Sequence, residues 1–224
     1  MPTSTVEDYL KRILLEQERA ESDDARVPTG RIATALDVSP GTVTSMVKAL
    51  ADGGLVEYEP YGGVRLTVAG RQLAAHVLRR HRLIELFLVK VLKMDWSEVH
   101  GEAESLEHAV SDRVLERIDE MLGHPKVDPH GDPIPDAAGA ITQPLLDSLL
   151  DCPIALPLRV ARVSDQQPEF LQLVAGRGLK PGSGLTVLRR DPSAAMVELR
   201  LASGESMSLG ERAASKIFVE TSGG

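Results

Sequence analysis

The chain has 224 residues, of which 42% are hydrophobic and 26% charged, and its formal net charge is −8. These fractions are typical of a folded globular protein and exclude wholesale disorder. No apolar run approaches the roughly 20 residues that a membrane span requires, and the first residues lack the basic and apolar segments of a secretion signal. The only cysteine, Cys152, excludes an internal disulfide and a Cys-x-x-Cys metal or redox motif. We therefore expect a cytoplasmic protein without a membrane partner.

Two helices are expected at the amino-terminal end of the chain. Ser4, followed three residues later by Glu7, has the pattern of a capping box that opens the first helix. Apolar residues then recur at helical spacing. Thr29 is expected to cap a second, shorter helix over residues 31–37, whose apolar residues share one face.

A compact unit follows the short helix. Ser39 and Pro40 predict the start of another helix over residues 41–51, because serine is a good cap and proline suits the first helical position. Residues 55–58 and 64–67 then form two short strand patterns joined by a turn rich in glycine. The order of helix, tight turn, helix and hairpin predicts a winged helix-turn-helix.

The middle of the chain is expected to be helical. A long helical pattern covers residues 67–93, a second covers residues 96–110, and Ser111 caps a third that ends near Gly123. Residues 125–135 contain four prolines and one glycine, which predicts a fixed loop rather than a helix or a strand.

The carboxyl-terminal part has the pattern of a small β-barrel. Short apolar runs alternate there with glycine and proline, and they cover residues 159–163, 185–188, 196–201 and 206–209. The fold class expected is mainly α with a small β part. We divide the chain into a winged helix-turn-helix domain (1–72), a helical domain (73–138), a linker (139–155) and a β-barrel domain (156–224).

The helix that begins at Pro40 is the candidate DNA-reading element. In helix-turn-helix proteins the start of the second helix enters the major groove. Val43, Val47 and Leu50 are expected to face the core. The edge that remains for bases and phosphates consists of Ser39, Pro40, Gly41, Thr42, Thr44, Ser45 and Lys48. Residues 1–70 carry seven basic and eleven acidic residues, so DNA affinity is expected to depend on a few placed cations, on helix dipoles and on dimerisation. The alternative is a winged helix used only for protein contacts.

Histidines and carboxylates gather on the helices that follow. His100, Glu104, Glu107 and His108 have the spacing i, i+4, i+7 and i+8, which places them on one helical face. The preceding helix adds His81 and Glu85, one turn apart. Crowded carboxylates favour a bound cation, so this pattern predicts a metal site; the alternative is a solvated helix face. The other histidines, His76, His124 and His130, are expected to be surface or loop residues, and Cys152 is not expected to be a ligand.

The order of these segments resembles the diphtheria toxin repressor family of metal-dependent regulators. The resemblance rests on Val77-Leu-Arg-Arg-His81-Arg-Leu-Ile-Glu85, on Trp96-Ser-Glu-Val-His100-x3-Glu104-Ser-Leu-Glu107-His108 and on the proline-rich loop from Gly123 to Pro135. It extends to Leu173-x4-Gly178-Leu-Lys-Pro-Gly, which is similar to the family's FeoA or SH3-like third domain. It implies a DNA-binding domain, a metal-binding and dimerisation domain and an SH3-like barrel.

The resemblance also implies two sets of metal ligands. The primary site would consist of Asp8, Glu104, Glu107 and His108. The ancillary site would consist of His81, Glu85 and His100, with Gln166 and Glu169 as the positions contributed by the third domain. Iron-responsive members have methionine and cysteine where this chain has Asp8 and Glu104, whereas manganese-responsive members have Asp and Glu. Compact manganese regulators add a glutamate at the position of Lys11, which makes their closely spaced pair of ions doubtful here.

The function expected is therefore a manganese-dependent repressor of metal-homeostasis genes. An oxygen-rich site without thiolate suits Mn²⁺, with Fe²⁺ next. The protein would bind a palindromic operator in double-stranded DNA as a metal-activated homodimer and would have no small-molecule substrate. The alternatives are an iron-dependent regulator of the same family and a metalloenzyme with carboxylate and histidine ligands. The enzyme is disfavoured because the two Glu-x-x-His motifs of a di-iron bundle are absent.

Overall fold

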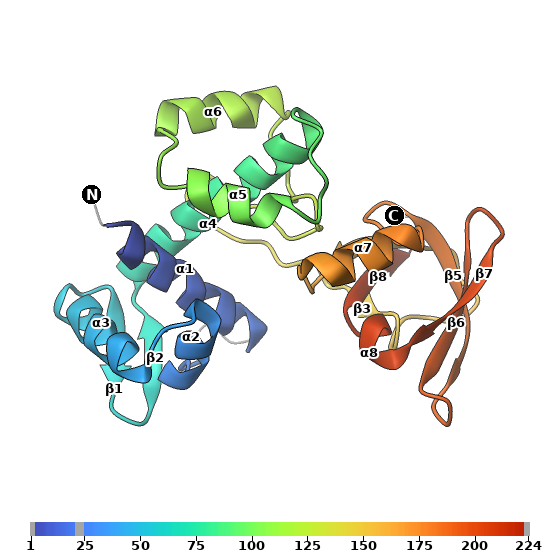
Figure 1. The fold of residues 1–224 in the computed structure, drawn as a ribbon, viewed down its shortest axis with the longest axis horizontal. Coiled ribbons are helices and arrows are strands. Elements are labelled where there is room, and N and C mark those ends of the chain that lie inside the picture. Colours follow the sequence, from blue (N-terminus) through green and yellow to red (C-terminus); the bar gives the residue numbers. More distant parts are fainter. Residues whose placement is uncertain (1–2, 21–24, 222–224) are drawn as a thin grey trace. The chain divides into compact units, whose positions relative to one another are not determined.

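The structure is a computed structural model that describes residues 3–20 and 25–221. It contains two compact units: residues 1–81 with 135–141, and residues 82–134 with 142–224. Each unit is described by itself (Figure 1). Within the described ranges, no helix is long and apolar enough to span a membrane.

The first unit opens with α1 (Ser4–Arg19). Thr3, rather than the expected Ser4, is its N-cap, and the Thr3 hydroxyl accepts a hydrogen bond from the Val6 backbone N–H at 3.4 Å. Threonine caps helices nearly as well as serine, so the helix begins one residue earlier than predicted. Glu7 consequently lies in the fourth helical position, beyond the third position that a capping box requires.

The next two helices form the helix-turn-helix. They are α2 (Thr29–Leu36) and α3 (Pro40–Asp52). The expectation for Thr29 was wrong, because Pro28 occupies the N-cap of α2 and no side chain caps that helix. The expectation for Ser39 is confirmed, since its hydroxyl accepts from the Thr42 backbone N–H at 3.1 Å. Asp37 ends α2 in the left-handed region (φ 52°), which makes the tight turn between the helices.

The wing is the antiparallel hairpin of β1 (Val56–Glu59) and β2 (Gly63–Leu66). The predicted hairpin is confirmed, with its strands shifted by one residue. A side chain at Gly70 would place its Cβ 1.9 Å from the Leu55 carbonyl oxygen, so glycine lets the following helix approach the hairpin closely. The core that joins helices and wing includes Leu10, Ile13, Ile32, Val43, Val47, Leu50, Val56, Val64 and Leu78.

The helical segments that follow are α4 (Val68–Lys90), α5 (Val99–Leu106) and α6 (Asp112–Met121). Ser111 caps α6 as expected, accepting from the Val114 backbone N–H at 3.4 Å. α5 is shorter than the predicted 96–110. Its start is delayed because the Asp95 carboxylate accepts from the Ser97 backbone N–H at 2.9 Å, which stabilises a turn instead of a helix.

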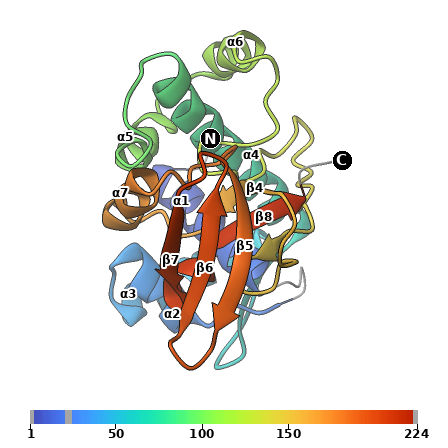
Figure 2. The ribbon, with the colours of Figure 1, turned by 90° about the vertical axis from the view of Figure 1, so that its right-hand side faces the viewer.

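The carboxyl-terminal domain is a six-stranded antiparallel sheet in the order β3-β8-β4-β5-β6-β7 (Figure 2). Its strands are β3 (Asp147–Ser148), β4 (Leu158–Val163), β5 (Gly184–Asp191), β6 (Met196–Leu201), β7 (Ser206–Gly210) and β8 (Ile217–Thr221). The four predicted runs correspond to β4, β5, β6 and β7. Sequence reading missed β3, which lies within the expected linker 139–155, and it missed β8 and the helices α7 (Pro168–Gly176) and α8 (Glu211–Ala214). Trp96, from outside the domain in sequence, belongs to this domain's core.

Candidate functional site: a recognition helix and carboxylate–histidine clusters

The expected DNA-facing edge of α3 is on the surface. Ser39, Pro40, Gly41, Thr42, Ser45 and Lys48 are exposed and Thr44 is half-buried, whereas Val43, Val47 and Leu50 are buried. The alternation follows from the helical period, which leaves the polar positions on the face opposite the core.

The hydroxyl groups of this edge are held by the helix itself. The Thr44 hydroxyl donates to the Pro40 carbonyl at 2.9 Å, and the Ser45 hydroxyl donates to the Gly41 carbonyl at 3.0 Å. Each oxygen therefore presents acceptor lone pairs outward, which suit the amino groups of bases rather than phosphate oxygens. The positive end of the α3 dipole and the exposed Lys48 ammonium are the features of this edge that suit a polyanion, despite the acidic composition of the chain.

The metal candidates on α5 do not share one continuous helical face. The helix ends at Leu106, so Glu107 is its C-cap and His108 lies in the turn that follows. Glu107 is fully buried, and its Oε1 lies 3.4 Å from His108 Nε2. These two neighbours still converge, but through the turn after the helix rather than through helical spacing.

Glu104 is placed differently from Glu107. Its Oε1 lies 3.6 Å from His100 Nε2, at an exposed position. On its other side, His100 Nδ1 lies 3.2 Å from Glu85 Oε1. His81 precedes Glu85 by one turn of the continuous helix α4, and both side chains are buried. Glu85, His100 and Glu104 therefore form a chain of neighbouring ligand atoms.

Asp8 is half-buried on α1, in the first unit, whereas Glu104, Glu107 and His108 belong to the second.

A further cluster, which sequence reading missed, consists of Glu85, Asp128 and His130. Each is fully or almost fully buried, and one ligand atom from each lies within 4.8 Å of the others. His130 Nδ1 is 3.9 Å from Glu85 Oε2 and 4.0 Å from Asp128 Oδ2. His130 lies in a loop, one of the two placements expected for it, but within that loop it is 0% exposed.

The chemistry of this cluster fits a cation. His130 Nε2 donates to the Trp96 carbonyl at 2.8 Å, which leaves Nδ1 of the neutral ring with a lone pair. Neither His130 Nδ1 nor Asp128 Oδ2 has a hydrogen-bond partner. A histidine that ligates a metal almost always donates its second ring N–H to a carbonyl or carboxylate in this way. Burial, together with the charges of Asp132 and Glu85, raises the pKa of Asp128 well above its usual range, and a bound cation would remove that penalty.

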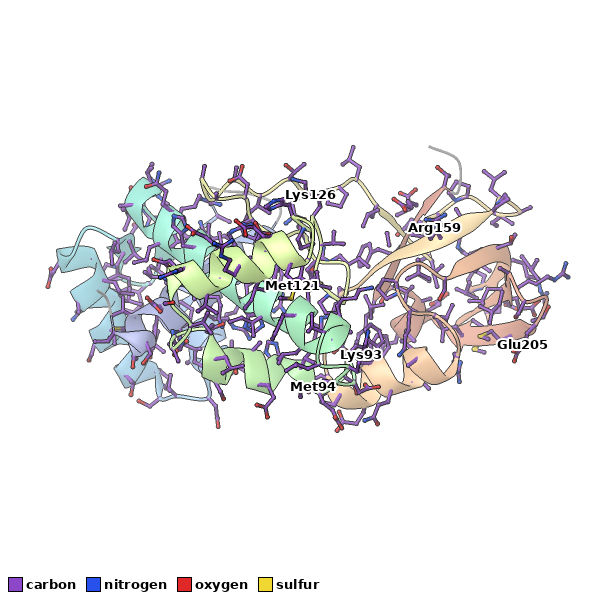
Figure 3. All side chains as sticks on the ribbon, turned by 90° about the horizontal axis from the view of Figure 1, so that it is seen from above. Lys93, Met94, Met121, Lys126, Arg159 and Glu205 are labelled. Atoms are coloured by element: carbon purple, nitrogen blue, oxygen red, sulfur yellow. The ribbon has the colours of Figure 1, made fainter. Side chains whose placement is uncertain are left out.

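The loop that carries Asp128 and His130 is held against the carboxyl-terminal domain. The Val163 backbone N–H donates to the His130 carbonyl at 2.8 Å. A side chain at Gly131 (φ 90°) would place its Cβ 2.0 Å from the Ala161 carbonyl oxygen, so only glycine permits this approach. In Figure 3 the label Lys126 marks the start of this loop, and the label Arg159 marks strand β4.

Asp132 is the polar anchor of the same loop. Its Oδ1 lies 2.6 Å from Arg162 Nε, and its Oδ2 accepts from Gln166 Nε2 at 2.8 Å. Gln166, one of the two positions taken from the third domain, thus contacts the loop through its amide nitrogen. Glu169, the other, is exposed at the start of α7.

The remaining candidates behave in different ways. His76 and His124 are exposed, as expected. Cys152 is buried, and its Sγ lies 3.2 Å from an Arg190 guanidinium nitrogen. Burial raises the pKa of the Cys152 thiol, which disfavours the thiolate that a metal ligand requires.

Comparison with known proteins places each segment. The family described as iron dependent repressor, N-terminal DNA binding domain, matches residues 1–64. Iron dependent repressor, metal binding and dimerisation domain, matches residues 67–136, and the FeoA domain matches residues 148–221.

Whole-chain similarities agree with these matches. A solved manganese-dependent transcriptional repressor in complex with manganese is 44% identical, with a TM-score of 0.88 over 96% of this chain and 99% of that one. The manganese regulator SloR is 34% identical, with a TM-score of 0.75 over 99% of both chains. The iron-dependent repressor IdeR of Mycobacterium tuberculosis is 40% identical over 132 residues, which cover 58% of this chain and 55% of IdeR.

These matches confirm the expected fold class, a winged helix-turn-helix, a helical domain and an SH3-like domain. They also exclude the metalloenzyme alternative, because the matching families are DNA-binding repressors. The chain belongs to the diphtheria toxin repressor family of metal-dependent transcriptional regulators and carries a carboxyl-terminal FeoA domain.

Proposed function

We propose that this protein is a manganese-dependent repressor of metal-homeostasis genes that acts in the cytoplasm. It binds a palindromic operator as a metal-activated homodimer. DNA reading is assigned to residues 1–72, and metal binding with dimerisation to residues 73–138. The linker expected over residues 139–155 is shortened to 139–146, because β3 lies within that range and belongs to the sheet, so the SH3-like domain is assigned to residues 147–224 in place of 156–224. The observation that carries the proposal is a set of buried carboxylate and imidazole ligands in a chain with an exposed recognition helix.

The donor set favours manganese over iron. The candidate ligands are carboxylates and imidazoles, which suit a hard divalent ion, whereas thiolate and thioether suit softer ions. The one cysteine is buried against Arg190, and burial raises the pKa of its thiol, which disfavours a thiolate ligand. The Mn²⁺-bound repressor that resembles this chain over 96% of its length supports the same choice. Fe²⁺ remains the second candidate, supported by the similarity to IdeR.

We assign the ligands to two regions. The primary site consists of Asp8, Glu104, Glu107 and His108. The ancillary region consists of His81, Glu85 and His100, extended by Asp128 and His130, with Gln166 and Glu169 as contributions of the third domain. Because Glu85 approaches His100 with one oxygen and His130 with the other, it is the central residue of the ancillary region. Gln166 supports this region through Asp132.

The primary site accounts for activation. Asp8 comes from the unit that carries α3, while Glu107 and His108 come from the other unit. An ion held by residues of both units restrains the recognition helices of a dimer at one spacing. Without a cation the carboxylates repel each other and the units move more freely. The ion thus binds the DNA-competent arrangement more tightly, which is the condition for allosteric activation.

The test is a DNA-binding assay with a duplex selected from a random pool by the Mn²⁺-loaded protein. We expect Mn²⁺ to raise affinity about 10- to 100-fold over protein in chelator. Gel-shift curves that coincide with and without Mn²⁺ would overturn the proposal.

A variant tests the choice of metal separately. Replacing Asp8→Met together with Glu104→Cys exchanges two oxygen ligands for sulfur, so activation by Mn²⁺ should fall while activation by Fe²⁺ or Co²⁺ persists. The measurement is anaerobic fluorescence anisotropy with the three ions. If the double variant responds to Mn²⁺ as the parent does, these two positions do not select the metal.

A further inference from the structure

Tyr61, at the tip of the wing, is the most exposed large apolar side chain of the described residues, with a relative exposure of 108%. The chain has seven aromatic residues, all within the described ranges, and the other six are buried or half-buried. An aromatic ring that contacts nothing in its own domain loses the burial that normally favours aromatic residues. Its presence at the tip therefore has no explanation in the packing of the wing.

The backbone of the turn also disfavours tyrosine. Gly62 N–H donates to the Glu59 carbonyl at 3.0 Å, and Tyr61 has φ 65° at the third position of this turn. The combination of Pro60 before it and positive φ is that of a type II turn, in which glycine or asparagine is preferred at this position. A bulky residue there is strained, and such strain persists chiefly where it serves a function.

The charges around Tyr61 are balanced by ion pairs. Two carboxylates, Glu57 and Glu59, lie on β1 next to the tip. Arg65 Nη2 lies 2.8 Å from Glu57 Oε2. Arg26 Nη2 lies 3.5 Å from Glu57 Oε2, and Arg26 Nε lies 3.6 Å from Glu59 Oε2. Two guanidinium groups thus offset two carboxylates, so the tip does not repel phosphate as its sequence alone suggests.

The position of the tip is fixed relative to α3. β1 follows α3 directly, and Val56 and Val64 of the wing share a buried core with Val43 and Val47 of α3. Four strand residues carry the tip about 14 Å from the base of the hairpin, comparable to the roughly 12 Å width of the major groove. In Figure 1 the turn projects beyond the helices of its domain. With α3 in the groove, a hairpin of this length is long enough to reach the DNA backbone that flanks it.

We propose that Tyr61 contacts the sugar–phosphate backbone beside the base pairs that α3 reads, with its ring against a sugar and its hydroxyl donating to a phosphate oxygen. The inference rests on the proposed function, because it requires DNA as the partner. Tyrosine is among the side chains that make such backbone contacts, which position a protein on the duplex without reading sequence.

The experiment uses the full chain with Mn²⁺ and one selected duplex in two lengths, the shorter trimmed by about 5 base pairs, half a helical turn, at each end. Tyr61→Ala is expected to weaken binding to the long duplex about tenfold, as for loss of a hydrogen bond to a charged group. Tyr61→Phe should lose less, because it keeps the ring. On the short duplex these variants and the parent should bind alike.

Two controls separate binding from folding. Tyr61→Gly removes the ring and relieves the positive φ, so its Tm should rise while its affinity for the long duplex falls as in Tyr61→Ala. Val68→Ala removes another exposed side chain of the same domain (79% exposed) and should leave affinity unchanged. Parent-like binding of Tyr61→Ala to both duplexes would overturn the inference. A parent that binds neither duplex in Mn²⁺ would overturn the proposed function with it.

Discussion

The recognition helix α3 is built from one short segment of the chain, whereas the cluster at His130 is assembled from segments that lie far apart in the sequence. The functional edge of α3 lies within one helical segment, and Ser39 and Pro40 mark its start. The cluster at His130 instead joins a loop residue pair to Glu85, more than 40 residues earlier in the chain. The surface of α3 follows from local spacing, whereas the cluster depends on how the loop docks. A change in α3 should therefore act locally, and a change in the cluster should affect metal, loop and stability together.

The largest effect is expected for Glu85→Gln. The fully buried Glu85 faces His100 with one oxygen and His130 with the other, so a neutral amide removes the charge that both ligand groups share. We expect activation by Mn²⁺ to fall by up to about 100-fold, measured as the ratio of DNA affinities with metal and with chelator. Glu102→Gln, an exposed position on α5, is the control. If Glu85→Gln keeps the activation ratio of the parent, the cluster around Glu85 does not contribute to activation by Mn²⁺.

His130→Phe and His124→Phe compare two histidines that sequence reading treated alike. The His130 change keeps a ring beside Trp96 but removes the donor to the Trp96 carbonyl and the Nδ1 lone pair. We expect about 10- to 100-fold weaker Mn²⁺ binding by calorimetry. The unpaired carbonyl should also cost about 1–3 kcal/mol of stability in urea unfolding. His124 is exposed and its Nδ1 contacts Asp119 Oδ2 at 2.8 Å, so its change should cost less, about 0.5 to 1 kcal/mol. Equal effects at both positions would contradict the buried site.

Lys48→Ala tests whether α3 acts locally. Lys48 is exposed, away from the Val47 and Leu50 core, so its loss should weaken DNA binding about tenfold and lower the slope of log affinity against log salt by about one. Mn²⁺ binding and Tm should not change. Lys90→Ala, which removes an exposed cation at the end of α4, is the matched control. A loss of Tm comparable to a core deletion would show that the DNA-facing side of α3 is assigned wrongly.

The smallest expected effect concerns the two helix caps. Ser39→Ala should cost about 1 kcal/mol, because the Thr42 backbone N–H loses its acceptor. Thr29→Ala should stay within about 0.5 kcal/mol, since Thr29 lies inside α2 and caps nothing. Urea unfolding of the two variants measures the difference. Equal costs would mean that the cap assignment in the structure does not govern helix stability.

The sequence predicts the features that depend on local spacing better than those that depend on contacts between distant segments. Helical spacing and cap residues predict α3 and its exposed edge, and alternating apolar runs predict β4 to β7. β8 and α7 were missed although each carries a local signal: Ile217, Phe218 and Val219 form a short strand pattern, and Pro168 suits the first position of a helix.

In the metal region, sequence spacing identified Glu85, His100 and His108, but it assumed one helix over residues 96–110. The Asp95–Ser97 turn delays the start of that helix, and the helix ends at Leu106, so Glu107 and His108 converge through the turn that follows it. Asp128 and His130 had one usable signal, an Asp-Pro-His-Gly-Asp run within a loop that its prolines predict to be fixed. Their burial depends on Gly131 and β4, a tertiary contact that local patterns do not encode.

The central claim is that metal binding and DNA binding are coupled through this chain. It is tested most directly by measuring the affinity of the full chain for Mn²⁺ by calorimetry, alone and in the presence of saturating selected duplex. Because coupling is reciprocal, the duplex should tighten Mn²⁺ binding by the same factor, about 10- to 100-fold, by which Mn²⁺ tightens DNA binding. Identical Mn²⁺ affinities with and without the duplex would contradict the account.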